Sequence, residues 1–314
     1  MRSNAFRPGV SEAYRSVVAC SSTRAPYDAE QRSVKRRTSL RRMKTAKLLA
    51  ELRVPPGRPA DVAHRDPGDR LGFGDKLAGS ARLTELVAEL SLLQHRLWAE
   101  ARRSLLLVLQ GLDASGKDGT ISHVLSGVNP QGCRVHSFKA PVGAELAHDY
   151  LWRIHAACPE HGELGVFNRS HYEDIVTVRV KELMPKRVWK RRPRHIREFE
   201  RMLADEDTTV VKVFLNVSRE EQGRRLQERL ENPEKAWKFR REDLESRARF
   251  DDYIAAYDWV LTETSTDWAP WYVVPADRNW IRNLAVAELL VAALRVIDPQ
   301  LPPADPELKG LRIT

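Results

Sequence analysis

A chain of 314 residues, 42% of them hydrophobic and 30% charged, is long enough for one large or two modest domains and has the composition of a soluble globular protein. No apolar run approaches the roughly 20 residues that cross a bilayer, which excludes a protein built on membrane-spanning helices. The formal net charge of +9 is uneven: residues 1–42 hold ten Lys and Arg against three Asp and Glu, a net of +7, so the other 272 residues carry only +2. Only local basic clusters can therefore indicate a polyanionic partner.

The three cysteines, Cys20, Cys133 and Cys158, have neither a paired spacing nor the spacing of a metal site. This pattern is typical of a reducing compartment, so we expect a cytoplasmic protein without a disulfide framework.

The first part of the chain shows no clear period. Residues 1–42 are rich in Ser and Arg and lack the apolar core of a secretory signal, so we expect residues 1–50 to form a disordered extension. Met43 opens MKTAKLLAEL, which has the character of a protein start, and translation from Met43 is the alternative. We expect one folded domain over residues 51–300 and a tail over residues 301–314.

The pattern of hydrophobic residues predicts an α/β fold. Residues 53–79 are rich in Pro and Gly and predict an extended lead-in, and helical spacing of apolar residues follows from Leu83 to Leu97. The predicted strands are Leu105–Gln110, Cys133–Phe138, Leu164–Phe167, Val210–Val217 and Trp271–Pro275, and the predicted helices lie around Lys117–Ser126, Gly143–Ala156, Pro193–Ala204, Arg219–Glu231, Leu244–Thr262 and Trp280–Ile297. This alternation predicts an αβα sandwich with a central parallel sheet of about five strands, whose ligands bind beyond the carboxyl ends of the strands.

The sequence GLDASGKDG follows the first predicted strand and has the G-x-x-x-x-G-K frame of a phosphate-binding loop. Its glycines let backbone N–H groups converge on an anion at a helix N-terminus, and Lys117 adds a point charge. The predicted phosphate contacts of this loop are Gly111, Ala114, Ser115, Gly116, Asp118 and Gly119.

Two carboxylates in this loop are unexpected for an anion site. Asp118 occupies the position of the Ser or Thr that ordinarily binds Mg²⁺, where it either contacts the site or only adds charge to the first helical turn. Asp113 would repel a phosphate unless a divalent cation lies between them, so we predict that Asp113 is a metal ligand. A general base and a solvated loop aspartate are the alternatives for Asp113.

A second polar cluster follows the strand at Leu164–Phe167. Many phosphate-loop enzymes carry an Asp for Mg²⁺ at this strand end, but here the residue is Asn168, a weaker candidate ligand. Arg169 suits bidentate contact with phosphate, and Glu173 restores negative charge. His171 is either a base or a residue that only makes structural hydrogen bonds.

The sequence resembles the polyphosphate kinase 2 family. The resemblance rests on GLDASGKDG and FNRSHYED, and also on GVNPQGCRVHSFKAP, ELAHDYLWRIH, NPEKAWKF and APWYVVPAD, and it covers roughly Leu52 to Ile297. It implies a cytoplasmic protein with a phosphate-loop kinase-like fold and a helical lid. The implied reaction moves a phosphoryl group between inorganic polyphosphate and adenine or guanine nucleotides, with Mg²⁺, or Mn²⁺ as an alternative. It also implies a homo-oligomer, either a dimer or a tetramer.

The sequence Asn168-Arg169-Ser170 distinguishes this chain from the branch of that family that has Asp at the first position. The chain is similar to the branch that phosphorylates both nucleoside monophosphates and diphosphates. The resemblance implies catalytic roles for Asp113, Lys117, Arg169 and Glu173, and a metal site at Asp113 with Asn168 as a weaker second ligand.

The segment KRVWKRRPR holds six basic residues in nine. A solvated face is one interpretation. The other is a binding strip for polyphosphate made by Lys186, Arg187, Lys190, Arg191 and Arg192. Nucleic acid is a less favoured partner because Trp189 is the only aromatic residue available for base stacking.

Residues 218–243 are the predicted lid. Ser218 and Glu221 have the spacing of a capping box, and Asn232 is followed by a proline that ends the helix. Arg224, Arg225 and Arg229 either form ordinary ion pairs or, as the resemblance implies, close over the phosphates and exclude water.

The predicted reaction is reversible in-line transfer from the end of polyphosphate to AMP or ADP. An ATP-dependent nucleotide kinase with the same core is one alternative, although it would usually keep Ser or Thr at position 118. A nucleotide-gated protein that binds nucleic acid through the basic strip is the other alternative.

Overall fold

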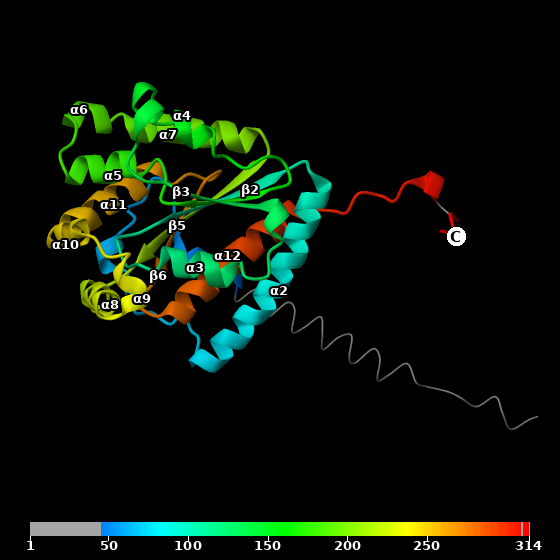
Figure 1. Cartoon of the computed structure of the whole chain (residues 1–314), viewed down its shortest axis with the longest axis horizontal. Helices are drawn as coiled ribbons and strands as arrows, with labels where there is room; N and C mark the ends of the chain where they lie inside the picture. The colour runs from blue at the N-terminus through cyan, green and yellow to red at the C-terminus, as the bar shows by residue number, and fades with distance from the viewer. Residues whose placement is uncertain (1–44, 309, 314) are drawn as a thin grey trace, which may run out of the picture. The chain divides into compact units, whose positions relative to one another are not determined.

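The computed structural model describes residues 45–308 and 310–313. Met43 and most of the expected N-terminal extension therefore lie outside the described residues. The strands are β1 (Arg53–Val54), β2 (Ser104–Gln110), β3 (Cys133–Ser137), β4 (Leu164–Asn168), β5 (Thr208–Asn216) and β6 (Trp271–Pro275). They form one sheet of six strands in the order β1-β6-β5-β2-β4-β3. Figure 1 labels β2, β3, β5 and β6 of this sheet.

The five predicted strands are all present and all parallel, which confirms the predicted α/β class. Every residue of β2 is buried, because this strand is paired on both sides and covered on both faces. The sixth strand, β1, pairs with β6 in the antiparallel direction and lies in the region predicted as an extended lead-in. With two residues, β1 is too short to show any periodicity in the sequence.

One face of the sheet is covered by α2 (Lys76–Glu100), α3 (Lys117–Val124) and α12 (Asn279–Ile297). The helix α2 starts seven residues before the predicted Leu83, where the Asp75 side chain accepts a hydrogen bond from the Ala78 N–H at 2.8 Å. Such an N-cap satisfies one of the free donors of the first turn and defines the start of the helix.

The other face is covered by α5 (Glu173–Val180), α7 (Arg192–Asp205) and α11 (Phe250–Thr264). Figure 1 shows α5 and α7 above β2 and β3, and α2, α3 and α12 below these two strands. Each face buries its own apolar cluster, so the architecture is the predicted αβα sandwich.

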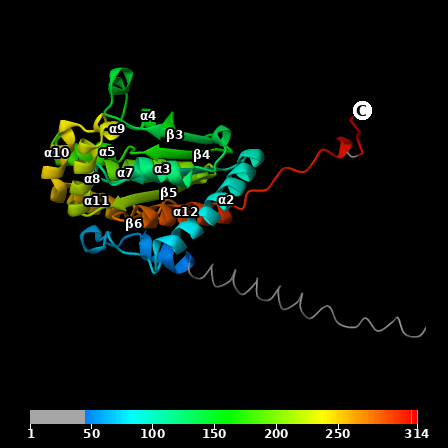
Figure 2. The same ribbon diagram turned by 60° about the horizontal axis from the view of Figure 1, so that its bottom comes forward.

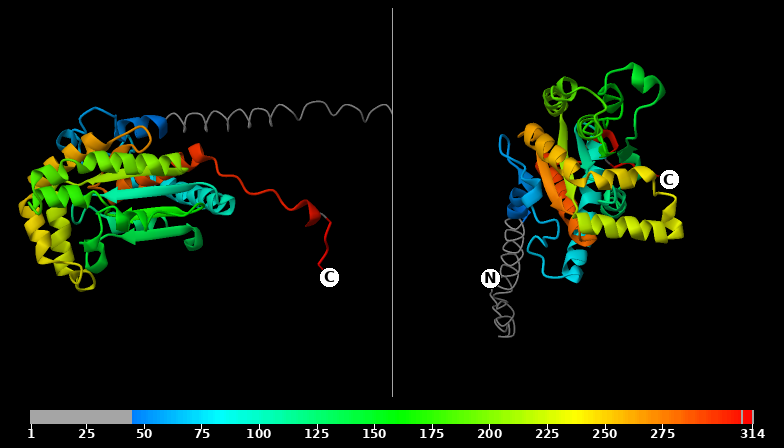
Figure 3. Two further views of the ribbon diagram at one scale, coloured as in Figure 1. Left: turned by 90° about the horizontal axis from the view of Figure 1, so that it is seen from above. Right: turned by 90° about the vertical axis from the view of Figure 1, so that its left-hand side faces the viewer.

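The helices α8 (Arg219–Glu231), α9 (Pro233–Ala236) and α10 (Arg241–Ala248) lie at the carboxyl ends of the strands, toward which the arrows point in Figures 2 and 3. The Ser218 side chain accepts a hydrogen bond from the Glu221 N–H at 3.1 Å, as predicted. The capping box is nevertheless incomplete, since the Ser218 N–H donates to Asp277 at 2.8 Å and not to Glu221.

Two predicted helices are wrong in their continuity. The region predicted as one helix over 143–156 contains a 3-10 turn, η4 (Gly143–Ala147), and a single helical turn, α4 (Trp152–His155). The region predicted as one helix over 244–262 divides at Arg249 into α10 and α11. Further short elements are η2 (Val62–His64), η3 (Pro130–Gly132), α6 (Lys186–Trp189) and η5 (Pro306–Leu308), and residues 45–52 are helical as well.

Within the described part of the chain, no helix has the length and apolar character that crossing a membrane requires.

Candidate active site

The predicted phosphate loop lies between the carboxyl end of β2 and the start of α3. Gly116 has a φ of +101°, which is strained for any residue with a side chain. A Cβ atom at Gly116 would also collide with the guanidinium of Arg282. The positive φ therefore favours glycine at this position, and a side chain here would also displace Arg282.

Inside this loop, the hydroxyl of Ser115 is buried and has no hydrogen-bond partner among the described residues. The N–H of Ser115 donates to the Leu112 carbonyl at 3.1 Å and so closes a turn. Buried polar groups in proteins almost always have a partner, and an unpaired one at the bend of a loop indicates the place of a ligand. The orphan hydroxyl supports the prediction that Ser115 contacts a phosphate.

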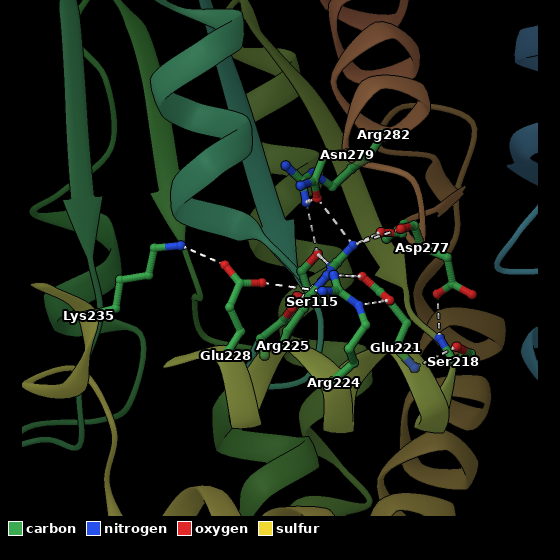
Figure 4. A network of polar contacts seen from close by, with 12 residues as sticks. Ser115, Ser218, Glu221, Arg224, Arg225, Glu228, Lys235, Asp277, Asn279 and Arg282 are labelled. Atoms are coloured by element: carbon green, nitrogen blue, oxygen red, sulfur yellow. Dashed lines mark hydrogen bonds and ion pairs between the residues drawn. The ribbon is translucent and has the colours of Figure 1, made fainter. Parts of the chain in front are cut away.

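Two arginines from other elements support this loop from behind (Figure 4). Arg225 of α8 donates to the carbonyls of Ala114 and Ser115 at 3.1 and 3.2 Å. The other terminal nitrogen of Arg225 donates to the carbonyls of Ala276 and Asp277 at 2.7 and 3.0 Å. Arg225 thus ties the loop to the end of β6.

Arg282 of α12 is the second arginine behind the loop. It is buried, donates to Asn279 at 2.8 Å and lies 3.5 Å from the Ser115 carbonyl. Burial, together with the nearby charge of Arg225, lowers the pKa of Arg282 to about 10. Two guanidinium groups behind the loop add positive potential to an anion site.

The three arginines predicted for the lid do not occupy equivalent places. Arg225 was expected to face the phosphates, but its guanidinium is turned to backbone carbonyls and to Glu221 at 2.8 Å. Arg224 is exposed and pairs with Glu221 and Glu228, while Arg229 lies 3.3 Å from Asp243. Of these three arginines, Arg225 supports the loop, and only Arg224 is exposed.

Lys117 is buried at the start of α3. Its ammonium donates to the carbonyls of Gly111 and Leu112 at 2.7 and 3.1 Å. Burial, and secondarily the charge of Arg169, lowers the pKa of Lys117 to about 8. A buried, poorly solvated cation of this kind is strongly stabilised when an anion binds next to it.

Arg169 and Asp113 meet at the carboxyl ends of β4 and β2. The guanidinium of Arg169 donates to Asp113 Oδ1 in a direct ion pair. Glu173, with Asp113 as a smaller contributor, raises the pKa of Arg169, so this arginine keeps its charge. Arg169 has a φ of +62°, a backbone conformation that persists only where surrounding contacts enforce it and that is frequent at functional sites.

Glu173 is the first residue of α5 and lies near this pair. Its Oε2 accepts a hydrogen bond from the Thr177 hydroxyl at 2.6 Å. With its amide oriented to donate, Gln110 contacts Glu173 Oε1 at 3.0 Å, and its oxygen accepts from Ser170. Gln110, the last residue of β2, therefore links the phosphate loop to the segment after β4.

Asp118 and Asn168 are joined in the structure, although 50 residues separate them in the sequence. The amide nitrogen of Asn168 donates to Asp118 Oδ1 at 2.8 Å, and Lys238 lies 3.9 Å from Oδ2. In other phosphate-loop enzymes a hydroxyl stands at the first position and a carboxylate at the second. Here the carboxylate, Asp118, stands at the first position, and a neutral residue, Asn168, stands at the second.

The predicted basic strip is only partly available to a ligand. Lys186, Arg187, Lys190 and Arg191 are exposed on α6 and the turn after it. Arg192 is buried, donates to the Asp174 carbonyl and lies 4.4 Å from the ring centre of Tyr150, so its role is internal packing.

The aromatic residue of this segment is also internal. Trp189 is buried and packs edge-on against Trp259 with ring centres 5.3 Å apart. His171 is buried as well, with Nε2 3.5 Å from Glu200, away from the loop residues that it would have to reach as a base.

The sequence did not indicate three residues that hold the site together. Gln110 and Arg282 are described above, and Gln222 of α8 donates to the Asp113 carbonyl at 3.2 Å. Gln110 could have been suspected as a polar residue that ends an otherwise apolar strand. Nothing in the sequence around Arg282 or Gln222 shows that these side chains turn inward.

Comparisons with known proteins show what this chain is similar to. Residues 74–302 match the family described as Polyphosphate kinase 2 (PPK2). The AMP/ADP-polyphosphate phosphotransferase of Meiothermus ruber is 53% identical over 255 residues, which cover 81% of this chain and 96% of that protein. The ADP-polyphosphate phosphotransferase of Rhodopseudomonas palustris is 45% identical over 232 residues, which cover 70% of this chain and 80% of that protein.

A solved structure is also similar to this chain. The crystal structure of Polyphosphate Kinase 2 from Arthrobacter aurescens TC1 aligns with a TM-score of 0.78 at 43% identity. The alignment covers 81% of this chain and 91% of that one.

Proposed function

The chain belongs to the polyphosphate kinase 2 family, and from this premise we propose that it transfers a phosphoryl group reversibly between inorganic polyphosphate and the adenine nucleotides AMP and ADP. Its similarity to an AMP/ADP-polyphosphate phosphotransferase over nearly the whole of that protein supports both acceptors. Guanine nucleotides are a second acceptor class.

One observation in the site carries the proposal. Lys117, Arg169 and Asp113 lie together at the carboxyl ends of β2 and β4, around the phosphate loop. This loop lacks the usual hydroxyl after its lysine. Phosphoryl transfer requires positioning and charge neutralisation more than covalent chemistry, and these side chains supply both.

A single assay tests this function. The protein is mixed with AMP or ADP, Mg²⁺ and polyphosphate, without ATP, and the nucleotides are separated by chromatography. We expect AMP to yield ADP and ATP, and ADP to yield ATP. Turnover only with ATP as donor would instead support a conventional nucleotide kinase. Absence of both activities, with salt-sensitive binding of nucleic acid, would support a nucleic-acid-binding protein.

The residues of the site have distinct roles in this mechanism. The loop amides and Ser115 hold one phosphate, and Lys117 turns from the loop carbonyls to the bridging or terminal oxygens. Arg169 neutralises charge on the transferred group, and Glu173 orients the acceptor side. Arg224 and Arg229 close the lid and exclude water, which would otherwise compete with the nucleotide for the phosphoryl group.

The donor atoms present fit Mg²⁺, with Mn²⁺ as an alternative. Among the described residues, no cluster of three or more His, Cys, Asp and Glu is arranged to hold a metal unaided. Mg²⁺ prefers one or two carboxylates together with phosphate oxygens and water, so it would be held by Asp113 and Asp118 with the substrate phosphates. Asn168 could contribute only its amide oxygen, since its nitrogen donates to Asp118. When bound, the cation would neutralise charge on the phosphates.

Exchanging the two side chains tests whether the carboxylate has moved to position 118. We expect Asp118→Asn to raise the Mg²⁺ concentration for half-maximal rate about tenfold or more, because both positions are then amides. The double variant Asp118→Asn/Asn168→Asp should recover most of the affinity, and Asn168→Asp alone is the control for added charge. The readouts are Mg²⁺ titrations of the rate and Mn²⁺ binding by electron paramagnetic resonance. An unchanged requirement in Asp118→Asn would assign Asp118 to the helix N-terminus alone.

The lowered pKa of Lys117 predicts a pH dependence. Below about 8 the free enzyme holds Lys117 as a cation, and above it the charge is lost, so kcat/KM for polyphosphate should fall as pH rises through about 8. Bound phosphate favours the charged form, so the fall in kcat should come at a higher pH. Initial rates from about pH 7 to about pH 10 measure both profiles, and a flat kcat/KM profile would contradict the role of Lys117.

Further features follow from the family and stay predictions. We propose that Lys186, Arg187, Lys190 and Arg191 bind the distal part of a polyphosphate chain, through spaced positive charge. Assembly into a dimer or tetramer and a cytoplasmic location are expected as well. Light scattering coupled to size-exclusion chromatography measures the first, and cell fractionation the second.

A further inference from the structure

A closed polar network lies in the core between the sheet and the helices α7 and α11. The ammonium of Lys212 on β5 donates to Glu200 Oε2 at 2.6 Å, to the Tyr172 hydroxyl at 2.9 Å and to the Thr264 carbonyl at 2.7 Å. The Tyr172 hydroxyl donates in turn to Glu200 Oε1 at 2.7 Å. All four residues are buried.

The polar groups of Lys212 and Tyr172 are all used. Each of the three N–H groups of the Lys212 ammonium donates to one acceptor, each oxygen of Glu200 accepts at least one hydrogen bond, and His171 Nε2 lies 3.5 Å from Glu200 Oε1. Burial by itself would raise the pKa of Glu200, but the charge of Lys212 holds it below its ordinary value. The pair is therefore ionised and balanced.

Stability is a weak explanation for a buried ion pair in the core. The desolvation of two charges offsets their attraction, and replacement of a buried ion pair by apolar residues is often neutral or stabilising. The network fixes the orientation of Tyr172, because hydrogen bonds hold its hydroxyl at a defined position and an apolar contact would not.

Tyr172 connects this network to the candidate active site. It directly precedes Glu173 and lies three residues after Arg169, whose φ of +62° needs support from its surroundings. The chain after β4 has a second anchor, in which the Gln110 oxygen accepts a hydrogen bond from Ser170 at 3.0 Å. Tyr172 is the anchor on the side nearer Glu173.

We propose that the buried network of Tyr172, Glu200 and Lys212 positions Arg169 and Glu173 for phosphoryl transfer, an inference that rests on the proposed function. The three are positioning residues, since none of them reaches the loop. Their loss displaces groups that act on the transition state more than on the bound substrates. Accordingly kcat falls while KM for polyphosphate and for nucleotide stays near its wild-type value.

The decisive variant replaces all three polar groups with apolar ones, as Tyr172→Phe/Glu200→Met/Lys212→Met. No charge is left unpaired, but the buried Thr264 carbonyl loses its donor, so the Tm is expected to fall by a few degrees. A small displacement of catalytic groups is expected to lower kcat about 10- to 100-fold. The single variant Tyr172→Phe, which keeps the ion pair, is expected to show a smaller loss in the same direction.

The matched control is Thr208→Val. It breaks the buried hydrogen bond between Ser104 Oγ and Thr208 Oγ1, 2.9 Å apart, at the amino ends of β2 and β5, far from the site at their carboxyl ends. We expect this variant to change Tm without changing kcat. A kcat loss in the control that equals that of the triple variant at matched Tm would assign the effect to stability and overturn the inference.

Amide hydrogen exchange tests the same inference without turnover. We expect faster exchange over residues 168–180 in the triple variant and not in Thr208→Val. Wild-type protein without polyphosphate-dependent transfer would refute the proposed function. Unchanged exchange over 168–180, or a wild-type kcat in a folded triple variant, would overturn the positioning role.

Discussion

Lys117→Ala is expected to lower kcat about a thousandfold while the protein keeps its fold. The lysine is the buried point charge of the phosphate loop, and the removal of one preorganised charge at a transferring group costs this much in comparable sites. Polyphosphate-dependent formation of ATP from ADP measures the loss.

The stability of the Lys117→Ala variant should equal or exceed that of the wild type, although its kcat falls. Burial lowers the pKa of Lys117 from 10.5 to about 8, which corresponds to an unfavourable contribution on the order of 3 kcal/mol when the lysine is charged. Since the unfolded chain binds the proton more tightly, this penalty diminishes as pH rises from about 8 toward 10.5. Alanine removes the penalty, so the Tm of the variant at neutral pH should equal or exceed that of the wild type.

Lys181→Ala is the matched control for the lost lysine. Lys181 is exposed and follows α5 at the end opposite Glu173. Surface positions of this kind contribute little, so its kcat should stay within a few-fold of the wild type. If Lys117→Ala retained a kcat within tenfold of wild type at an unchanged Tm, the proposed role of this lysine would be rejected.

Asp113→Asn is expected to lower kcat about 100- to 1000-fold. The substitution keeps the shape of the side chain and removes its charge, so it weakens both the contact with Arg169 and the affinity for Mg²⁺. A higher Mg²⁺ requirement should accompany the loss of rate. Stability should change by no more than about 1 kcal/mol because the ion pair is partly exposed.

Asp205→Asn is the control for this isosteric change. Asp205 ends α7 and pairs with Arg201 at 2.9 Å on an exposed surface away from the phosphate loop. We expect wild-type kinetics and an unaltered Mg²⁺ requirement. A similar Mg²⁺ requirement in Asp113→Asn and the wild type would contradict the assignment of Asp113 as a metal ligand, even if the rate fell.

Much of the fold could be predicted because its signals are local. The bounds of α8 agree with the predicted Arg219–Glu231, since Ser218 caps its start and Asn232 precedes a proline. The strand β6 agrees with the predicted Trp271–Pro275. The two-residue β1 and the break at Arg249 were missed, because neither interrupts the hydrophobic pattern.

The candidate site could be predicted only in part. The residues of the phosphate loop could be predicted together because its two glycines and its lysine lie in one continuous stretch of sequence. Asp118 and Asn168 were considered separately, and only the fold joins them in one hydrogen bond. The sequence likewise could not show that Arg225 faces backbone carbonyls while Arg224 faces solvent.

The sequence by itself determined the α/β class, the phosphate loop and the resemblance to one kinase family. The helical period, the short apolar runs of the strands and the glycine positions are properties of neighbouring residues, and they specify local backbone geometry directly. The tertiary structure alone decided that Arg282 lies behind the loop and that Lys212 meets Glu200 and Tyr172 in the core. These contacts join distant parts of the chain, and burial of a charged side chain depends on how all surrounding elements pack.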